Sequence, residues 1–272
     1  MSKITDIQCF LLDMDGTFYL GNKLIDGSLD FVNYLRSEGK KFIFLTNNSS
    51  KSSIDYVEKL RMFGCNVAEE DIFTSGEATT IYLSQIKNNA KIFLLGTKAL
   101  EDEFISQGFE LVNGVETTPD FVVLGFDQTL TYNKLWLACD LIRDGVPYIA
   151  THPDFNCPLE GGKYMPDTGS MIELIKASTG KTPYVVGKPN SYIIEAICLK
   201  HGLLKENLAM AGDRLYTDIQ TGINANITSI LVLSGETRLE DYKQSSIKAD
   251  YVFNSLKELH QAILEEKSNE SV

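Results

Sequence analysis

Positive charge is scarce in this chain. Its 272 residues include 25 lysines and arginines against 37 aspartates and glutamates, so the net charge at neutral pH is −12. A balance of this sign repels the phosphate backbone of nucleic acids and the anionic surface of membranes. We therefore expect neither a nucleic acid nor a membrane as a partner.

The sequence also lacks a long apolar run. No segment approaches the roughly 18 consecutive apolar residues that a membrane-spanning helix needs. At the N-terminus, MSKITDIQCFLLDMDG, the aspartates Asp13 and Asp15 interrupt the only apolar stretch, so this segment does not match a secretory signal. We predict a cytoplasmic protein.

Several metal and catalytic motifs are missing. The five cysteines are odd in number, scattered and without a CxxC pair, which argues against a disulfide framework and a zinc site. The three histidines form neither HxxxH nor HExxH, and the chain has no GxSxG. Gly180-Lys181-Thr182 ends like a P-loop, but Ile175 stands at the first required glycine. Zinc hydrolases, serine hydrolases and P-loop proteins are therefore unsupported.

Short apolar runs alternate with amphipathic stretches along the whole chain. This alternation is typical of βα units around a parallel sheet, so we predict an α/β fold. Strands are expected at residues 7–12, 41–46, 91–95, 121–124, 147–151, 183–186, 208–211 and 228–233. Helices are expected at residues 28–37, 191–200 and 255–266, the last of which ends at the polar tail KSNESV.

Two polar segments have the composition of hinges, residues 86–89 and 178–181. Hinges at these places would make the middle of the chain an insertion between two halves of one core. We therefore predict a discontinuous core domain of residues 1–86 and 182–272, with an inserted domain of residues 87–181.

The sharpest chemical feature is FLLDMDGT, in which an apolar strand leads directly to Asp13 and Asp15. The carboxyl end of a strand is the usual ligand-binding edge of an open α/β sheet. Two carboxylates there repel each other unless a cation or a proton is present. A solvated turn is the alternative on these residues alone. An EF-hand is excluded, because Thr17 and Phe18 stand where a ligand and a glycine are required.

A second and a third strand end in residues that suit an anion. KFIFL is followed by Thr46, Asn47 and Asn48, which would either cap a helix or hold an anion with side-chain and backbone donors. Lys188 follows YVVG and precedes a proline. It is either a solvated surface lysine or a fixed positive charge for a phosphate.

A fourth strand, LAMAG, ends at Asp213, and Asp218 stands near the start of the following helix. Asp218 alone would be a partner for the helix dipole. Asp213 together with Asp13 and Asp15 would form an oxygen-rich site suited to Mg²⁺.

The order DxDGT, TN, KP and GDxxxxD resembles the haloacid dehalogenase-like hydrolases over nearly the whole chain. FLLDMDGTFYLG, FLTNNSS, VVGKPN and GDRLYTDI are most similar to class IIA, which includes p-nitrophenyl, pyridoxal phosphate and phosphoglycolate phosphatases. FVVLGFDQTLTY and ATHPDFNCPLEGGKYMPDTGS resemble the α/β cap of this class. The resemblance implies a Rossmann-like, doubly wound parallel-sheet core with an inserted smaller α/β cap domain.

The resemblance also implies an activity, a Mg²⁺-dependent hydrolysis of small phosphomonoesters such as p-nitrophenyl phosphate, a sugar phosphate or a nucleotide. Asp13 would be the nucleophile that forms an aspartyl-phosphate, and Asp15 the general acid and base. Mg²⁺ would be held by the Asp13 carboxylate, the Asp15 backbone carbonyl and Asp213, with Asp218 a direct or indirect ligand.

The same resemblance implies that Thr46, Asn47 and Lys188, with Asn48 nearby, hold the phosphoryl oxygens. Asp15 disfavours dehalogenation, because a halide leaving group needs no proton. A phosphotransferase and a non-catalytic module that binds a cation or a phosphorylated ligand remain as alternatives.

Substrate choice is expected to come from the cap, in segment 154–167. Cys157 stands where the pyridoxal phosphate phosphatases carry a histidine, so a contact to a pyridoxal ring is not implied for this position. Caps of this class can form dimers, which leaves a homodimer through the cap open. The predicted partner is a small phosphorylated metabolite.

Overall fold

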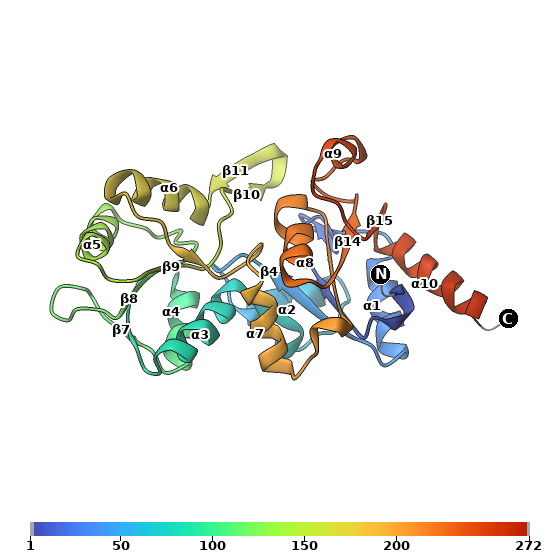
Figure 1. Cartoon of the computed structure of the whole chain (residues 1–272), viewed down its shortest axis with the longest axis horizontal. Helices are drawn as coiled ribbons and strands as arrows, with labels where there is room; N and C mark the ends of the chain where they lie inside the picture. The colour runs from blue at the N-terminus through green and yellow to red at the C-terminus, as the bar shows by residue number, and fades with distance from the viewer. Residues whose placement is uncertain (1–2, 271–272) are drawn as a thin grey trace. The chain divides into compact units, whose positions relative to one another are not determined.

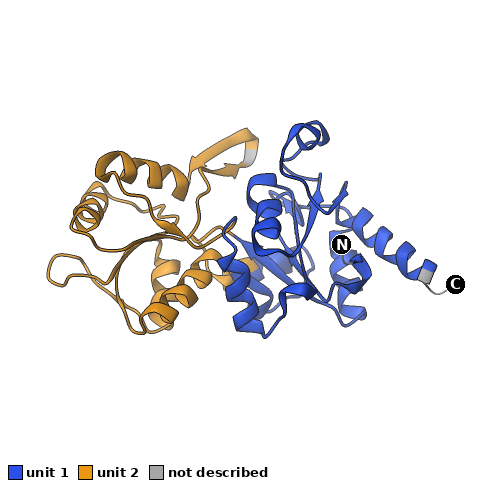
Figure 2. Cartoon of the chain, in the orientation of Figure 1, with its two compact units in different colours: residues 1–46, 57–73, 189–272 blue, residues 47–56, 74–188 orange. Residues whose placement is uncertain are grey.

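A computed structural model gives the structure of residues 3–270, drawn in Figure 1. The chain divides into two compact units, coloured in Figure 2. Unit 1 contains the residues up to Thr46, Val57–Phe73 and the residues from Pro189 onward. Unit 2 contains Asn47–Tyr56 and Thr74–Lys188.

A six-stranded sheet lies at the centre of unit 1, in the order β15-β14-β13-β1-β4-β5. The strands are β1 (Cys9–Leu12), β4 (Lys41–Thr46), β5 (Ile72–Thr74), β13 (Leu208–Gly212), β14 (Thr228–Val232) and β15 (Tyr251–Phe253). β1 is parallel to both of its neighbours, β13 and β4. The chain adds strands to one side of β1 first and later to the other side, so the strand order reverses between β1 and β13. In open α/β sheets, ligands bind at the carboxyl ends of the strands beside such a reversal.

The sequence of β1, CFLL, explains its central place. All four residues are buried, and the continuous apolar run is typical of a parallel strand that is covered on both faces. Helix α1 (Ser28–Ser37) packs against β4 and against α10 (Leu256–Glu270). Phe31 of α1 meets Phe10 of β1 edge to face, with ring centroids 5.4 Å apart. This packing fixes the strand whose carboxyl end carries Asp13.

Unit 2 has its own five-stranded sheet, in the order β12-β9-β8-β6-β7, with every pairing parallel. The strands are β6 (Lys91–Leu95), β7 (Glu110–Leu111), β8 (Phe121–Leu124), β9 (Tyr148–Ala150) and β12 (Tyr184–Val185). Helices α5 (Tyr132–Arg143) and α6 (Thr168–Thr179) share a core with this sheet, which includes Leu124, Ile142 and Ile175. An antiparallel hairpin, β10 (Asn156–Leu159) and β11 (Lys163–Pro166), connects β9 to α6.

The remaining helices and strands lie between the strands already described. The helices are α2 (Ser53–Met62), α3 (Ser75–Ile86), α4 (Lys98–Ser106), α7 (Tyr192–His201), α8 (Gln220–Ala225) and α9 (Leu239–Gln244). A second small hairpin, β2 (Tyr19–Leu20) and β3 (Lys23–Leu24), follows β1. Of the residues that the structure describes, no helix combines the length and apolar character needed to cross a membrane. All five cysteines lie among the described residues and are free thiols.

The predicted α/β class, with a parallel core sheet and a second parallel sheet, is confirmed. Strands β4, β6 and β8 and helix α1 begin and end at the predicted residues. The prediction missed the edge strands β5, β7 and β15, which have two or three residues each and too short an apolar run to stand out. The predicted end of the last helix was wrong, because α10 continues to Glu270. Its polar tail has no glycine or proline to stop a helix.

The compact units change at residues 46/47, 56/57, 73/74 and 188/189, whereas the predicted domains change at 86/87 and 181/182. Compactness describes contacts in the folded chain, and a domain is a segment that folds by itself. The domain boundaries therefore stay a prediction.

Phe31→Ala is expected to lower the free energy of unfolding by about 3–5 kcal/mol, because the fully buried ring would leave a cavity between α1 and the sheet. Urea unfolding measures this change. Met62→Ala is the control, since that side chain is 80% exposed, and a change within about 0.5 kcal/mol is expected there. Equal losses in the two variants would contradict the packing described for α1.

Candidate functional site

Three carboxylates gather at the carboxyl ends of β1 and β13, within unit 1. One oxygen from each of Asp13, Asp213 and Asp218 lies within 4.8 Å of the others. Asp13 extends the ladder of β1, because its N–H donates to the carbonyl of Ala211 at 2.9 Å. Asp213 follows β13 directly, and Asp218 lies in the π-helix Leu215–Ile219 that comes next. The sheet thus brings two distant parts of the sequence together in one acidic cluster.

Backbone donors orient two of these carboxylates. Asp213 Oδ2 accepts from the N–H of Glu236 at 2.6 Å, and Asp218 Oδ2 accepts from the N–H of Arg214 at 3.0 Å. Both aspartates are buried, whereas Asp13 is partly exposed. No sequence pattern predicts the contact from Glu236, which lies in the loop after β14.

Glycines leave the space that the carboxylates occupy. A Cβ atom at Gly16 would lie 2.4 Å from Asp213 Oδ2, and one at Gly235 would lie 2.0 Å from the same oxygen. A Cβ at Gly212 would lie 2.3 Å from Asp218 Cγ. Gly16 also has a φ of +90°, which other residues rarely adopt. Any larger residue at these places would displace an acidic side chain.

The cluster has the electrostatics of a cation site. Burial, and then the charges of Asp13 and Asp218, raise the pKa of Asp213 well above its ordinary value. Asp213 Oδ1 is buried and has no hydrogen-bond partner among residues 3–270. An unsatisfied, crowded carboxylate is costly, and a divalent cation would both neutralise it and take its free oxygen as a ligand. An all-oxygen donor set suits hard cations such as Mg²⁺ and Ca²⁺.

Asp15 lies next to this cluster in sequence, but its side chain is not one of the three. The predicted metal contact through its backbone carbonyl stays a prediction. Burial raises the pKa of Asp15, against the opposing charges of Lys59 and Arg214. Its backbone forms an isolated bridge with Tyr19. A carboxyl group with a raised pKa keeps its proton to higher pH, as a general acid must.

Thr46 ends the strand beside β1. Leu12 of β1 is opposite Phe44 of β4, so Asp13 and Thr46 follow at the same edge of the sheet. Thr46 is buried. The sheet register therefore brings the first two predicted motifs to neighbouring strand ends.

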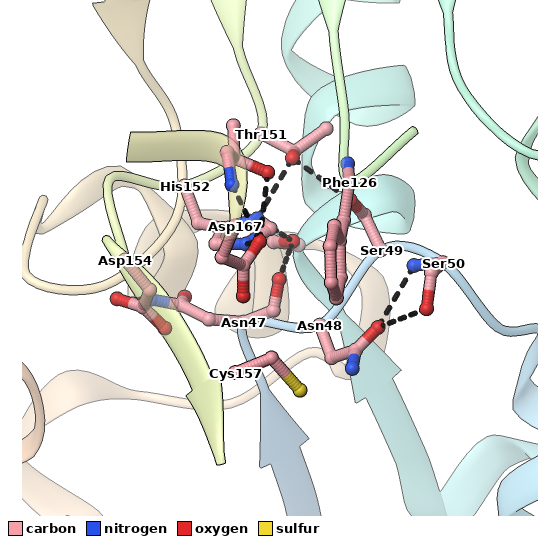
Figure 3. Close-up of polar contacts among 12 residues, drawn as sticks. Asn47, Asn48, Ser49, Ser50, Phe126, Thr151, His152, Asp154, Cys157 and Asp167 are labelled. Atoms are coloured by element: carbon pink, nitrogen blue, oxygen red, sulfur yellow. Dashed lines mark hydrogen bonds and ion pairs between the residues drawn. The ribbon is translucent and has the colours of Figure 1, made fainter. Parts of the chain in front are cut away.

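Asn47 and Lys188 are joined to each other within unit 2, and Figure 3 includes Asn47. Asn47 Oδ1 accepts from the N–H of Lys188 at 2.8 Å, and Asn47 Nδ2 donates to the Lys188 carbonyl at 2.9 Å. Nδ2 also donates to Asp154 Oδ1 at 3.2 Å. Gly187 permits this approach, because a Cβ there would lie 2.7 Å from Asn47 Oδ1. The Asn47 carboxamide thus holds the backbone of the predicted phosphate-binding lysine.

Asn48 forms a local turn. Its Oδ1 accepts from the N–H of Ser50 at 2.9 Å and from the Ser50 hydroxyl at 2.7 Å, as Figure 3 shows. This pattern is an Asx turn before the helix α2. The side-chain carbonyl of Asn48 is therefore used within this turn, whereas the N-terminus of α2 is capped by Ser52, whose hydroxyl accepts from the N–H of Asp55 at 3.3 Å.

Sequence reasoning missed a group of buried polar residues around His152 and Asp167, also drawn in Figure 3. The imidazole Nε2 and Asp167 Oδ1 are 2.9 Å apart. The available signal was the segment THPD, which directly follows an apolar strand just as the other motifs do.

Comparison with known proteins identifies the fold and its relatives. A family model described as haloacid dehalogenase-like hydrolase matches residues 10–110, and a related HAD-hydrolase model matches residues 185–259. The chain is 35% identical to an acid sugar phosphatase of Staphylococcus epidermidis over 249 residues, which is 92% of this chain and 95% of the relative.

Solved structures agree with the sequence relatives. A 4-nitrophenylphosphatase from Thermotoga maritima superposes with a TM-score of 0.91 at 48% identity, covering 96% of this chain and 100% of the other. A glycerol phosphate phosphatase from Mycobacterium tuberculosis, solved in complex with magnesium, has a TM-score of 0.88 at 30% identity, covering 96% of this chain and 79% of the other.

Asp213→Asn is expected to remove most of the stabilisation by Mg²⁺ and to stabilise the metal-free protein. In the wild type, Mg²⁺ at one hundred times its dissociation constant should add about 2.7 kcal/mol to the free energy of unfolding. The variant should lose most of this gain and should be the more stable protein in EDTA, because one crowded charge is removed. Thermal unfolding with Mg²⁺ and with EDTA measures both effects.

In EDTA, the difference in free energy of unfolding between Asp213→Asn and the wild type should increase with pH. The raised pKa of Asp213 means that its folded, metal-free form disfavours the charged state. The advantage of Asp213→Asn in EDTA should therefore appear as the pH rises above the ordinary carboxyl pKa of about 3.9 and level off above the raised value. Asp102→Asn, on the exposed face of α4, is the control and should follow the wild type. If the difference in stability between Asp213→Asn and the wild type is the same from acid to neutral pH, electrostatic crowding of Asp213 is contradicted.

Proposed function

The chain belongs to class IIA of the haloacid dehalogenase-like hydrolases and is a small-molecule phosphatase, and we propose that it uses Mg²⁺ and a phosphorylated Asp13 to hydrolyse phosphomonoesters. The observation that carries the proposal is the cluster of Asp13, Asp213 and Asp218, in which one buried oxygen of Asp213 has no hydrogen-bond partner among the described residues. The relative solved with magnesium supports this choice of cation.

In the first step, a carboxylate oxygen of Asp13 attacks the phosphorus atom in line with the ester bond. The bond between phosphorus and the ester oxygen breaks, and Asp15 gives its proton to the leaving oxygen. The products are the alcohol and an aspartyl-phosphate on Asp13. The raised pKa of Asp15, caused by burial of its carboxyl group, supports this role because it favours the protonated form that a general acid needs.

In the second step, the Asp15 carboxylate takes a proton from water. The resulting hydroxide attacks phosphorus, the bond to Asp13 breaks, and inorganic phosphate leaves. Both residues return to their starting charge, so the cycle balances. When bound by Asp13, Asp213, Asp218 and the Asp15 carbonyl, Mg²⁺ supplies positive charge that lets an anionic nucleophile approach an anionic ester.

The phosphoryl oxygens need donors that do not move during the reaction. We assign this task to the Thr46 hydroxyl, the backbone N–H groups of Asn47 and Asn48, and the Lys188 ammonium. The backbone is preferred for Asn47, because its carboxamide is hydrogen-bonded to Lys188 and Asp154. Lys188 supplies the one full positive charge among these donors.

Residues 87–181 act as the cap in this proposal, and segment 154–167 selects the substrate. The names of the relatives make sugar phosphates and glycerol phosphate the first substrates to test, together with p-nitrophenyl phosphate. A dimer formed through the cap is part of the same proposal and is checked by the mass of the protein in solution.

Asp13→Asn is expected to reduce the turnover of p-nitrophenyl phosphate by at least about 10³-fold, because the amide cannot form the phosphoryl ester. Release of p-nitrophenol with and without Mg²⁺ measures the loss. Asp102→Asn should retain the wild-type rate. An Asp13→Asn protein that is folded, binds Mg²⁺ and still turns over would contradict the aspartyl-phosphate.

The products separate hydrolysis from transfer. A phosphatase releases one inorganic phosphate for each p-nitrophenol, even when glycerol or a sugar is added as an acceptor. A phosphotransferase would release less phosphate than p-nitrophenol and form a new ester. A folded wild type that binds Mg²⁺ but releases neither product from any of these esters would favour a binding module.

A further inference from the structure

A buried histidine and aspartate lie at the end of β9, outside the proposed chemistry (Figure 3). His152 is completely buried, and its Nε2 is 2.9 Å from Asp167 Oδ1. On the other side of the ring, Nδ1 is 2.9 Å from the Thr151 hydroxyl and 3.5 Å from the Ser75 hydroxyl. Every hydrogen-bonding atom of the imidazole is therefore directed at a protein group.

Asp167 is held in place by hydrogen bonds at the start of α6, in addition to its contact with the imidazole. It is the N-cap of α6, where its Oδ1 accepts from the N–H of Thr168 at 2.6 Å and from the Thr168 hydroxyl at 3.1 Å. A carboxylate can only accept, so the imidazole carries a proton on Nε2. Asp167 thereby sets both the orientation and the tautomer of His152.

The charges around His152 come from three segments. Burial by itself lowers the pKa of His152, but the hydrogen bond and charge of Asp167, with the charge of Asp154, outweigh burial and the charge of Lys188. The pKa is therefore raised above its ordinary value. The charged groups around the imidazole are those of the proposed substrate-binding region.

Two connections lead from the imidazole to Asn47. The Ser75 hydroxyl, which faces Nδ1, donates to the backbone carbonyl of Asn47. Asp154, two residues after His152, accepts from Asn47 Nδ2 at 3.2 Å. The carboxamide of Asn47 in turn binds both backbone groups of Lys188. A chain of contacts thus runs from Asp167 through His152 to the lysine.

A third connection reaches the loop after β4. The Thr151 hydroxyl is 2.9 Å from the Ser49 hydroxyl, which accepts from the N–H of Phe126 at 2.9 Å. The Thr151 carbonyl also accepts from the N–H of Gly187 at 2.8 Å, directly before Lys188. The carboxyl ends of β8, β9 and β12 and the segment that begins at Asn47 are therefore tied together around one ring.

We propose that His152 and Asp167 form a positioning pair that holds Asn47 and Lys188 in the geometry required to bind a phosphoryl group. The proposal rests on the proposed function, in which these two residues contact the phosphoryl oxygens. Neither His152 nor Asp167 touches the substrate. They act through Ser75, Asp154 and the carboxamide of Asn47.

The test compares His152→Asn, Asp167→Asn and the double variant. His152→Asn keeps a polar group near Nδ1 but does not reach Asp167, and Asp167→Asn keeps an acceptor for the helix cap but removes the charge. Each single variant is expected to raise the KM for p-nitrophenyl phosphate and the Ki of inorganic phosphate by about tenfold, since small misplacements of binding groups are costly. The kcat should change less. The double variant should resemble the single variants, because the residues act as one unit.

Asp127→Asn is the matched control. Asp127 is also a buried aspartate of unit 2, but its carboxylate binds Lys134 and the N–H of Thr129, each at 2.9 Å, and within residues 3–270 it binds neither Asn47 nor Lys188. It should lose stability without a change in KM or Ki. Equal changes in KM and Ki for this control and for Asp167→Asn would overturn the proposal, as would wild-type constants in His152→Asn.

A second measurement is made on the wild type, and it requires no substitution at His152 or Asp167. The chain has three histidines, and His201→Gln and His260→Gln assign the imidazole ¹⁵N resonances by elimination. The His152 resonances should show a proton on Nε2 and should shift when Mg²⁺ and inorganic phosphate are added. Resonances of His152 that do not respond while phosphate binds would overturn the proposal.

The two proposals fail in different ways. A wild type without phosphatase activity would contradict the proposed function. If the wild type is active but the His152 and Asp167 variants keep its KM and Ki, and the His152 resonances do not respond to phosphate, only the positioning role is contradicted.

Discussion

Repulsion among three carboxylates at one edge of a sheet is the constraint on which the rest of this structure depends. Asp13, Asp213 and Asp218 are held together by a parallel ladder and by backbone donors, not by mutual attraction. Burial and this crowding raise the pKa of Asp213, which is the electrostatic cost of the arrangement. A proton on Asp213 or a bound divalent cation would relieve this cost, and the three carboxylates form a site suited to such a cation.

The same edge explains why the other motifs lie where they do. In a parallel sheet the carboxyl ends of all strands open at one side, so residues distant in sequence meet there. Thr46 joins the acidic cluster through the register of β4 against β1. In unit 2, Asn47 and Lys188 meet after separate strands and bind to each other.

Much of this was predicted from local pattern. Buried parallel strands have continuous apolar runs, and a polar cluster directly after such a run marks the functional edge. This reasoning predicts Asp13, Thr46, Lys188 and Asp213 as site residues, and the family to which their order points is confirmed by the comparisons. It failed for the short edge strands and for the last residues of α10, where neither burial nor a stop signal marks the boundary.

The sequence by itself determined the α/β class, the acidic character of the site and the family, because these follow from composition and from the order of residues along the chain. Only the tertiary structure decided that Asp213 has an unsatisfied oxygen, that Asn47 binds the backbone of Lys188 and that Asp167 orients His152. Each of these facts depends on how separate segments of the chain come together in the folded protein. Such contacts depend on sheet register and side-chain packing, which a local pattern does not encode.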